Sequence, residues 1–532
     1  MNWNMRLGAN LQANGSCSFL VWAPAVASVE LNLLEPHAQV MPMQPAPNGY
    51  FTATVDQVEP GWRYYYRLGT VDRPDPASRY QPKGVHGPSE VVKPNFDWQD
   101  SGWAGLPLRD YIIYELHVGT FTPEGTFDAI LEQLPSLQEL GITAIELMPV
   151  AQFPGGRNWG YDGVLPFAVQ NSYGGPAGLK RLINACHQVG LAVILDVVYN
   201  HLGPEGNYLP EFGPYFSDRY RTPWGQAFNF DGEFSDEVRR FFLENALFWQ
   251  MEFHIDALRL DAVHAIYDFA ATPFLQELTR AVHSQAQATG RPCHLIAESD
   301  LNDARYITAE HWGGYGLDAQ WSDDFHHCLH VLLTGEQTGY YSDFGGVTQF
   351  AKVFRHGYAY TGEYSAYRKR RHGNLPQHNA TRQFVVCAQN HDQIGNRMRG
   401  DRLSRLTDFE KLKLAAASVL LSPFVPLLFM GEEYGEVAPF PYVISHTDSQ
   451  LVEAVRHGRR EEFSGFQWQG EVPDPFAETT FRSSVLDRNL RQKADPHRTL
   501  HRFYQALIGI RKATPAIARA DHNSLEVQSS EL

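Results

Sequence analysis

The chain of 532 residues carries 44 basic and 60 acidic side chains, which gives a formal net charge of −16. Hydrophobic residues make up 43%, enough to bury a core, so a largely disordered chain is excluded. The acidic balance disfavours nucleic acid and anionic membranes as main partners. Five widely spaced cysteines without a CxxC pair predict buried free thiols in a reducing compartment, and the first residues show no apolar leader. We therefore expect a cytoplasmic protein.

Three regions differ in their sequence pattern. Residues 1–95 contain short strand-like bursts at 18–22, 29–33 and 51–55 between Gly, Pro and Asn turns, and this predicts a small, carbohydrate-binding-like β-sandwich. We expect a catalytic barrel with inserted loops over 96–470. For 471–532 we expect a short or truncated C-terminal region that contains the start of an incomplete β-domain.

The middle region alternates short apolar strands with amphipathic helices, which is typical of a parallel sheet buried on both faces. Strands are predicted at 111–118, 142–148, 192–198, 257–260, 294–297, 384–388 and 424–429, with an eighth near 317–320. A single helix is expected from an N-cap at Thr126 to Leu140, before Gly141. Neither GxGxxG nor GxxxxGK[ST] follows any of these strands. The pattern favours a (β/α)8 TIM barrel of the α/β class over an open nucleotide-binding sheet.

Acidic residues follow four of these predicted strands. Asp196 closes the apolar run 193–195 of its strand, Asp261 and Glu298 come directly after theirs, and Asp392 follows the strand at 384–388. Any one of them could simply cap a helix, but the carboxyl ends of barrel strands meet at one rim. Four acids at equivalent places therefore predict a carboxylate site.

Two chemistries suit such a site. A metal-dependent hydrolase needs ligand patterns such as HExxH or HxH, and none lies near these acids. Glycoside hydrolysis needs one ionised and one protonated carboxyl group. Arg259 lies two residues before Asp261 on the same strand, so both side chains share a barrel face, and the cation would favour ionisation of Asp261. These patterns alone predict a barrel hydrolase, without indicating the sugar.

Four motifs make the prediction more specific. Residues 196–201 (DVVYNH), 258–264 (LRLDAVH), 296–299 (IAES) and 389–393 (QNHDQ) resemble, in order and context, the four conserved regions of the α-amylase superfamily. The resemblance implies a retaining mechanism with Asp261 as nucleophile, Glu298 as general acid/base and Asp392 as transition-state stabiliser. It places further residues at the substrate: Tyr161, His201, Arg259, His264, Asp323, Asp324, Phe325, His326, Asn390, His391 and Gln393.

Within the superfamily the closer resemblance is to the malto-oligosyltrehalose trehalohydrolases, carried by residues 114–125, 158–163, 298–303, 320–327, 390–396 and 430–434. It implies cleavage of the α-1,4 bond next to the terminal trehalose of maltooligosyl-trehalose, and a link to a synthase that makes this substrate. The alternative is a 1,4-α-glucan branching enzyme, which shares the ELHVG opening; residues 390–396 and the DDFHH block favour the hydrolase. A catalytically silent glucan-binding protein is a third hypothesis, against which the intact acidic triad argues.

No cofactor and no metal are expected. Asn200 belongs to a calcium shell in some amylases, but no acid-rich loop surrounds it here. Asp196 is expected to orient Arg259 or His201 rather than to react. Glu432 and Glu433, after the eighth strand, are open between a rim position and a structural one.

Overall fold

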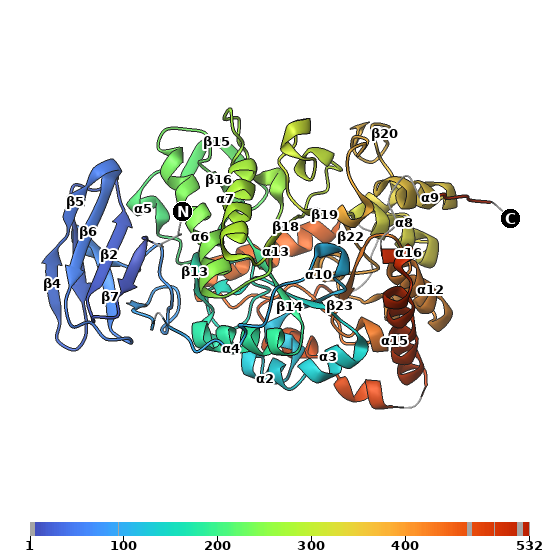
Figure 1. The fold of residues 1–532 in the computed structure, drawn as a ribbon, viewed down its shortest axis with the longest axis horizontal. Helices are drawn as coiled ribbons and strands as arrows, with labels where there is room; N and C mark the ends of the chain where they lie inside the picture. The colour runs from blue at the N-terminus through green and yellow to red at the C-terminus, as the bar shows by residue number, and fades with distance from the viewer. Residues whose placement is uncertain (1–5, 94, 465–470, 494, 519–524, 531–532) are drawn as a thin grey trace.

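The computed structural model describes residues 6–93, 95–464, 471–493, 495–518 and 525–530. A β-sandwich lies at one end of the molecule, the barrel in the middle, and helices α12 (Phe409–Leu420) and α15 (His497–Ala513) at the other end (Figure 1). Within the described residues no helix is both long and apolar enough to cross a membrane.

The sandwich consists of two antiparallel sheets, ordered β1-β2-β6-β5 and β4-β3-β7-β8, with β9 paired to β7. Alternate residues of β7 face inward, so Tyr64 and Tyr66 are buried, as expected for strands packed on one face. The hydroxyl of Tyr64 donates to Asp75 Oδ2 at 2.6 Å. The strands are β1 (Gly8–Leu11), β2 (Cys17–Trp22), β3 (Val29–Leu33), β4 (Gln39–Pro42), β5 (Gln44–Ala46), β6 (Tyr50–Val55), β7 (Arg63–Leu68), β8 (Val71–Arg73) and β9 (Ser89–Glu90).

Eight parallel strands form a closed barrel, as the sequence pattern predicts. The ring closes where β23 pairs with β10, with Leu427 beside Ile113. The barrel strands are β10 (Ile113–Leu116), β11 (Ala144–Leu147), β14 (Ala192–Val197), β17 (Ala257–Leu260), β18 (His294–Ala297), β19 (Ala319–Trp321), β22 (Phe384–Cys387) and β23 (Val425–Phe429). Hairpins β12 (Ala151–Gln152) with β13 (Leu165–Val169), β15 (Phe216–Thr222) with β16 (Gly225–Phe228), and β20 (Tyr364–Ser365) with β21 (Arg370–Arg371) extend its loops.

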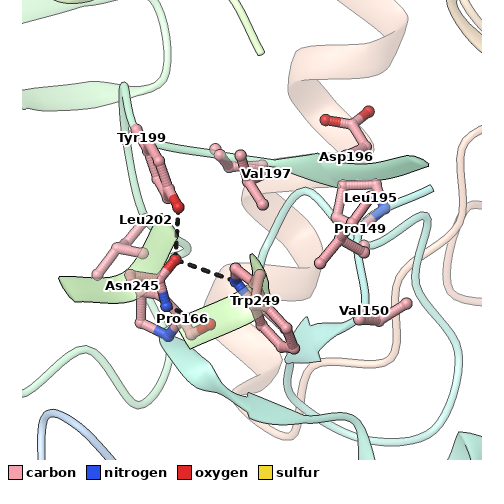
Figure 2. A pocket seen from close by; sticks show the side chains of 14 residues that line it. Pro149, Val150, Pro166, Leu195, Asp196, Val197, Tyr199, Leu202, Asn245 and Trp249 are labelled. Atoms are coloured by element: carbon pink, nitrogen blue, oxygen red, sulfur yellow. Dashed lines mark hydrogen bonds between the residues drawn. The ribbon is translucent and has the colours of Figure 1, made fainter. Parts of the chain in front are cut away.

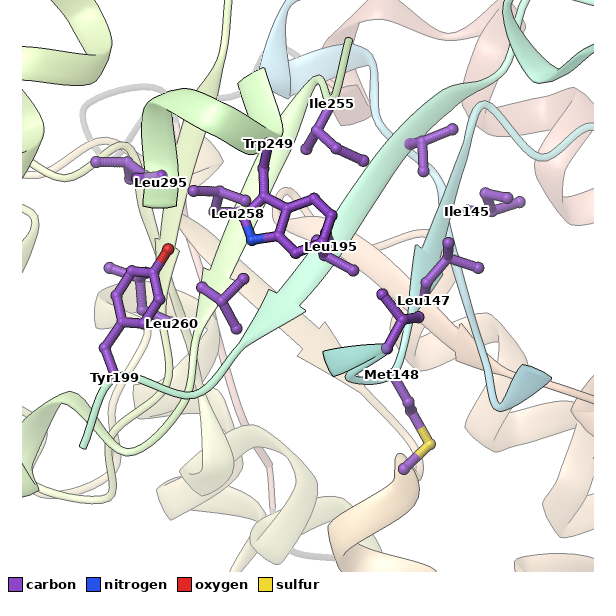
Figure 3. Packing of buried hydrophobic residues seen from close by; sticks show 14 of the residues in the cluster. Ile145, Leu147, Met148, Leu195, Tyr199, Trp249, Ile255, Leu258, Leu260 and Leu295 are labelled. Atoms are coloured by element: carbon purple, nitrogen blue, oxygen red, sulfur yellow. The ribbon is translucent and has the colours of Figure 1, made fainter. Parts of the chain in front are cut away.

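Alternation along the strands separates two environments. Outward residues such as Leu195 and Leu258 pack against Trp249 of helix α6 (Ser235–Glu252), as Figure 3 shows. Inward residues near the strand starts are small or apolar, among them Ala192 and Ala257. The next inward residue is the apolar Ile194 on β14 and the polar Arg259 on β17. Inward side chains therefore become polar only towards the carboxyl ends of the strands.

One predicted helix is interrupted. The segment expected as a single helix to Leu140 forms α2 (Phe127–Leu131) and α3 (Leu134–Leu140). Pro135 lies in the first turn of α3, where its missing N–H costs no bond, but it cannot continue a helix from the preceding turn. The predicted N-cap is confirmed, because Thr126 Oγ1 accepts from the N–H of Ala129.

The other helices are α1 (Val118–Phe121), α4 (Gly175–Gln188), α5 (Leu209–Phe212), α7 (Phe274–Thr289), α8 (Asp323–Thr334), α9 (Val347–His356), α10 (His391–Gly395), α11 (Leu403–Leu406), α13 (Ser449–Ser464), α14 (Glu478–Ser483) and α16 (Pro515–Ala518). The described part of 471–532 contains helices and no strand, which differs from the expected start of a β-domain. Helix α15 buries Leu500, Tyr504, Leu507 and Ile508, and this amphipathic spacing explains why the segment docks as a helix.

Candidate active site

Arg259 lies at the centre of the predicted carboxylate cluster, and its side chain is fully buried. Its Nη1 lies 2.8 Å from Oδ2 of Asp196 and 2.8 Å from Oδ1 of Asp261. Its Nη2 lies 3.4 Å from Oε2 of Glu298 and 3.9 Å from Oδ2 of Asp392. The structure thus brings all four acids of the predicted rim to one cation.

Asp261 follows β17 directly and is surrounded by donors. Besides Arg259, Nδ2 of Asn200 donates to its Oδ2 at 2.7 Å. Burial alone would raise the pKa of Asp261, but Arg259, His201 and Asn200 outweigh it and hold that pKa below its ordinary value. Asp261 is therefore ionised at neutral pH.

Glu298 follows β18 and is in the opposite state. Its Oε2 accepts from the backbone N–H of Ala262 at 2.7 Å, and Ala262 adopts a left-handed φ of 40° that is unusual for a residue with a side chain. Burial raises the pKa of Glu298 well above its ordinary value; Asp261 and Asp392 add to the shift, and Arg259 opposes it. A buried carboxyl group beside an ionised one is therefore available as a proton donor.

His391 supplies a second cation at the start of α10. Glu115 of β10 pairs with its Nδ1 and accepts from its backbone N–H at 3.0 Å. Its Nε2 lies 3.4 Å from Oδ2 of Asp392 and 2.6 Å from the hydroxyl of Tyr161. Burial alone would lower the pKa of His391, but Asp392 and Glu115 raise it to about 9. The imidazole is therefore protonated at neutral pH.

Asp196 orients Arg259, as the sequence predicts, and it also orients Tyr161. Its Oδ2 accepts from Tyr161 Oη at 2.6 Å as well as from Arg259. Figure 2 shows its carboxylate on the side of β14 opposite to Leu195. The small cavity of about 20 Å³ on the Leu195 side is held by hydrogen bonds from Tyr199 and Trp249 to Asn245, and it is too small for a substrate.

The carboxylates open into a cleft of about 570 Å³, lined by Tyr161, His201, Asp261 and Asp392. Trp224, in the turn between β15 and β16, also lines it, is 49% exposed and stacks on His201 with ring centroids 5.2 Å apart. The cleft has the volume and the mixed aromatic and polar walls of a small-molecule site.

The block at the start of α8 was expected to contact substrate, but three of its residues are turned away from the cleft. The Oδ2 of Asp324 is buried and accepts from Asn302 Nδ2 at 2.6 Å and from the N–H groups of Ala359 and Tyr360 at 2.7 and 3.0 Å. Asp324 therefore holds the loop that contains Ala359 and Tyr360.

Phe325 is 0% exposed and packs against the rings of Phe350 and Phe424. His326 is buried, and its Nδ1 and Nε2 pair with Ala388 O at 2.7 Å and Tyr341 Oη at 2.9 Å. Successive helical side chains point about 100° apart, so four consecutive residues of a helix cannot all face one cleft. Asp324, Phe325 and His326 are not among the residues that line the cleft, and their contact with substrate stays a prediction.

The remaining predicted residues lie around the site. Asp323 is half-buried, and burial together with Asp300 and Asp392 raises its pKa to about 8. Asn390 caps α10 and accepts from the N–H of Gln393 at 2.9 Å. His264 is half-buried after β17, and its buried Nδ1 has no hydrogen-bond partner among the described residues.

Three functional neighbours were missed. Glu115 holds His391 through its side-chain hydrogen bond to Nδ1. Glu146 faces the barrel interior, and its buried carboxyl oxygens have no hydrogen-bond partner within the described chain. The ring of Trp321 lies 4.4 Å from the guanidinium carbon of Arg259. Glutamates inside apolar strands were the available signal for the first two, because such charges are rarely buried without a role.

Asn200 does not resemble a calcium ligand, because its Nδ2 donates to Asp261 and its Oδ1 pairs with His201. In the described part of the chain no group of three His, Cys, Asp or Glu residues is placed to hold a metal. Glu432 and Glu433 are structural: both are buried, and they accept hydrogen bonds from Tyr504 and Tyr114 respectively.

The closed barrel and its carboxylate-lined cleft define a glycoside hydrolase of the α-amylase superfamily. The sequence matches two protein families in agreement with this fold. Residues 93–222 match the alpha amylase catalytic domain, and residues 6–80 match carbohydrate-binding module 48 (isoamylase N-terminal domain).

One relative is the malto-oligosyltrehalose trehalohydrolase of Saccharolobus solfataricus, 49% identical over 96% of this chain and 87% of its own length. A crystal structure described as a putative alpha amylase from Salmonella typhimurium superposes with a TM-score of 0.91 at 40% identity, covering 97% of this chain and 88% of that one. A 1,4-alpha-glucan branching enzyme of Bacillus caldolyticus is 31% identical, over 57% of this chain and 50% of its own. The chain belongs to the malto-oligosyltrehalose trehalohydrolase family.

Proposed function

We propose that the enzyme releases trehalose from maltooligosyl-trehalose by cleaving the adjacent α-1,4 bond with retention of configuration. The observation that supports the chemistry best is the opposed protonation of two acids around Arg259. Asp261 has a lowered pKa and Glu298 a raised one. This is the pair of states that a retaining glycosidase needs.

In the first step the Asp261 carboxylate attacks the anomeric carbon as the C–O bond to the leaving sugar breaks. Glu298 gives its proton to the departing oxygen, and a glycosyl ester forms on Asp261. In the second step Glu298 takes a proton from water, the water oxygen attacks the anomeric carbon, and Asp261 leaves as a carboxylate. Two inversions give net retention.

The remaining residues have supporting roles in this proposal. Asp392, beside the imidazolium of His391, accepts hydrogen bonds from sugar hydroxyls as positive charge develops on the ring. Tyr161 and His201 contact the sugar that is cleaved. Asp323 lies close enough to Glu298 for its charge to help raise the pKa of Glu298, and in this proposal it contacts the leaving sugars.

The specificity for maltooligosyl-trehalose over maltodextrin follows from the shape of the trehalose unit. Trehalose joins two glucoses through their 1-positions, so it is bent differently from maltose and presents different hydroxyls. A buried polar group left without its partner costs about 1–3 kcal/mol.

We expect cleavage of maltooligosyl-trehalose to exceed cleavage of the equal-length maltodextrin by at least roughly tenfold in kcat/KM, because two lost contacts exceed 1.4 kcal/mol. Chromatography of the products from both substrates measures this ratio and identifies the released sugar. Equal cleavage would contradict the proposal, and new α-1,6 branch points on plain glucan would indicate a branching enzyme instead.

The cellular compartment and the source of the substrate are part of the proposal. All five cysteines are free and buried, which suits a reducing cytoplasm. The substrate requires a preceding reaction that converts the reducing end of an α-glucan into a 1,1-linked unit, so we infer that a synthase of that kind acts before this enzyme.

A further inference from the structure

A second cavity, away from the carboxylates, lies between the β-sandwich and helix α4. Its volume of about 600 Å³ is as large as that of the catalytic cleft, at about 570 Å³. Tyr80 and Glu90 line it from the amino-terminal region, Pro176 and Lys180 line it from α4, and Phe96 from the connecting segment.

The walls of this cavity are held in place by backbone hydrogen bonds. The N–H of Glu90 donates to Tyr80 O at 3.0 Å, and the N–H of Gly61 donates to Val91 O at 2.9 Å. The ring of Tyr80 rests against the start of α4 at Gly175, where an added Cβ would lie 2.7 Å from Cε2 of the ring. A pocket with a fixed shape loses less entropy on binding.

The charges in the cavity do not suit an anion. Lys180 is already paired, with its Nζ 3.6 Å from Oε2 of Glu252 and 5.2 Å from the ring centroid of Phe253. The exposed Lys93 and Asp97 at the mouth carry opposite charges. Within the described chain the carboxylate of Glu90 has no hydrogen-bond partner, although the charge of Arg63 acts on it, so it is left as an acceptor for a ligand.

Half-buried aromatic rings beside a carboxylate without a hydrogen-bond partner in the described chain suit a neutral polyol, whose C–H faces pack on rings while its hydroxyls donate. The sequence likeness to a carbohydrate-binding module ends at Tyr80, on the wall of this cavity. We propose that the cavity is a second glucan-binding site that takes an α-1,4-linked segment of several glucoses. The choice of an α-1,4-glucan rests on the proposed function.

The position of the cavity suits the distal part of a long substrate. Helix α4 precedes β14 and, as in other βα units, runs antiparallel to the barrel strands. Its amino-terminal end, which borders the cavity, therefore faces the end of the barrel that carries Asp261 and Glu298. A long chain held there would remain close to the cleft and raise its effective concentration.

Calorimetric titration of the full-length Asp261→Asn protein with maltoheptaose tests the site, because this variant should bind without turnover. We expect two binding sites per chain. In the same background Ala177→Trp, which places a large side chain on the exposed cavity wall, should leave one, and so should Tyr80→Ala with Glu90→Gln.

Tyr65→Ala is the matched control, because Tyr65 lies on β7 of the same module and does not line the cavity. It should retain both sites. A single site in the Asp261→Asn protein, or loss of a site in Tyr65→Ala but not in Ala177→Trp, would overturn the proposal.

Kinetics give a second readout in the active protein. Ala177→Trp should raise KM several-fold for substrates of about 20 glucoses, with kcat and the KM of maltotriosyl-trehalose unchanged. An equal change for both lengths would also overturn the proposal. Failure of the trehalose assignment would appear in the released sugar and would leave the maltoheptaose titration unaffected, so the two failures are distinguishable.

Discussion

Arg259 explains how two carboxyl groups in one site adopt different protonation states. Its Nη1 contacts Asp261 at 2.8 Å, whereas its Nη2 is 3.4 Å from Glu298. Asp261 also accepts a hydrogen bond from the Asn200 amide, while within the described chain Glu298 accepts one only from the N–H of Ala262. The acid with more hydrogen-bond donors around it loses its proton first, and its negative charge then disfavours ionisation of the other.

Asp261→Asn should lower kcat by roughly 10³-fold or more, because an amide cannot form the glycosyl ester. Trehalose release under saturating substrate measures the effect, and thermal unfolding checks that the variant is folded. Asp110→Asn, at an exposed position, should keep wild-type activity. Near-normal turnover in Asp261→Asn would remove this residue from the mechanism.

The two pKa shifts predict the pH dependence of kcat/KM. Activity needs Asp261 ionised, and since its pKa is lowered, activity should fall on the acid side only below the ordinary aspartate range. Activity also needs Glu298 protonated, and since its pKa is raised, activity should fall as pH rises through that raised value.

Glu298→Gln tests the assignment of the alkaline limb. With maltosyl fluoride, whose leaving group needs no proton, the first turnover should survive in this variant and lose its alkaline decline. A decline that persists unchanged would assign the limb to another group.

At the scale of elements, helix α8 shows why neighbouring acids differ in role. Asp324→Ala should lower the free energy of unfolding by roughly 2–5 kcal/mol, because the N–H groups of Ala359 and Tyr360 and the amide of Asn302 lose a buried acceptor. Asp323→Ala should cost less than about 1 kcal/mol, because it removes a carboxyl group that burial disfavours. Urea unfolding of both variants measures the difference. A larger loss for Asp323→Ala would contradict this division.

The same helix shows how far the sequence could predict the site. Strand ends could be read from apolar runs, so the convergence of Asp196, Asp261 and Glu298 was predictable from topology. The direction of each side chain on α8 was not, because it depends on where the helix begins, and here it begins at Asp323 itself. Contacts from other elements, such as Glu115 with His391, join residues 276 positions apart and left no pattern that spacing alone could show.

At the scale of the whole molecule, the buried acid Glu432 links the barrel to the carboxyl-terminal helix α15. Burial raises the pKa of Glu432 to about 7, and Tyr504 of α15 donates to its Oε1 at 2.9 Å. The folded pKa exceeds the unfolded value of 4.5, so its stabilisation is fully present below pH 4.5 and is lost as pH rises to about 7.

Glu432→Gln should therefore flatten the fall in unfolding free energy between pH 5 and pH 8, by no more than about 3 kcal/mol. Denaturant titrations at both pH values measure the slope. Glu410→Gln, on the exposed face of α12, is the control and should keep the wild-type slope. An unchanged slope in Glu432→Gln would contradict the assigned titration.

The pairing of β23 with β10 has a consequence for how the protein matures. The groups around Arg259 come from β14, β17, β18 and the segment after β22, and His391 additionally needs Glu115 of β10. Contacts of such sequence separation form late, because loop closure must precede them. Until the last strand has paired with β10, that strand and the segment after β22 are not joined through the ring, so we expect the contact of Glu115 with His391 to form late. We therefore expect full cleavage of glucan only after the ring has closed.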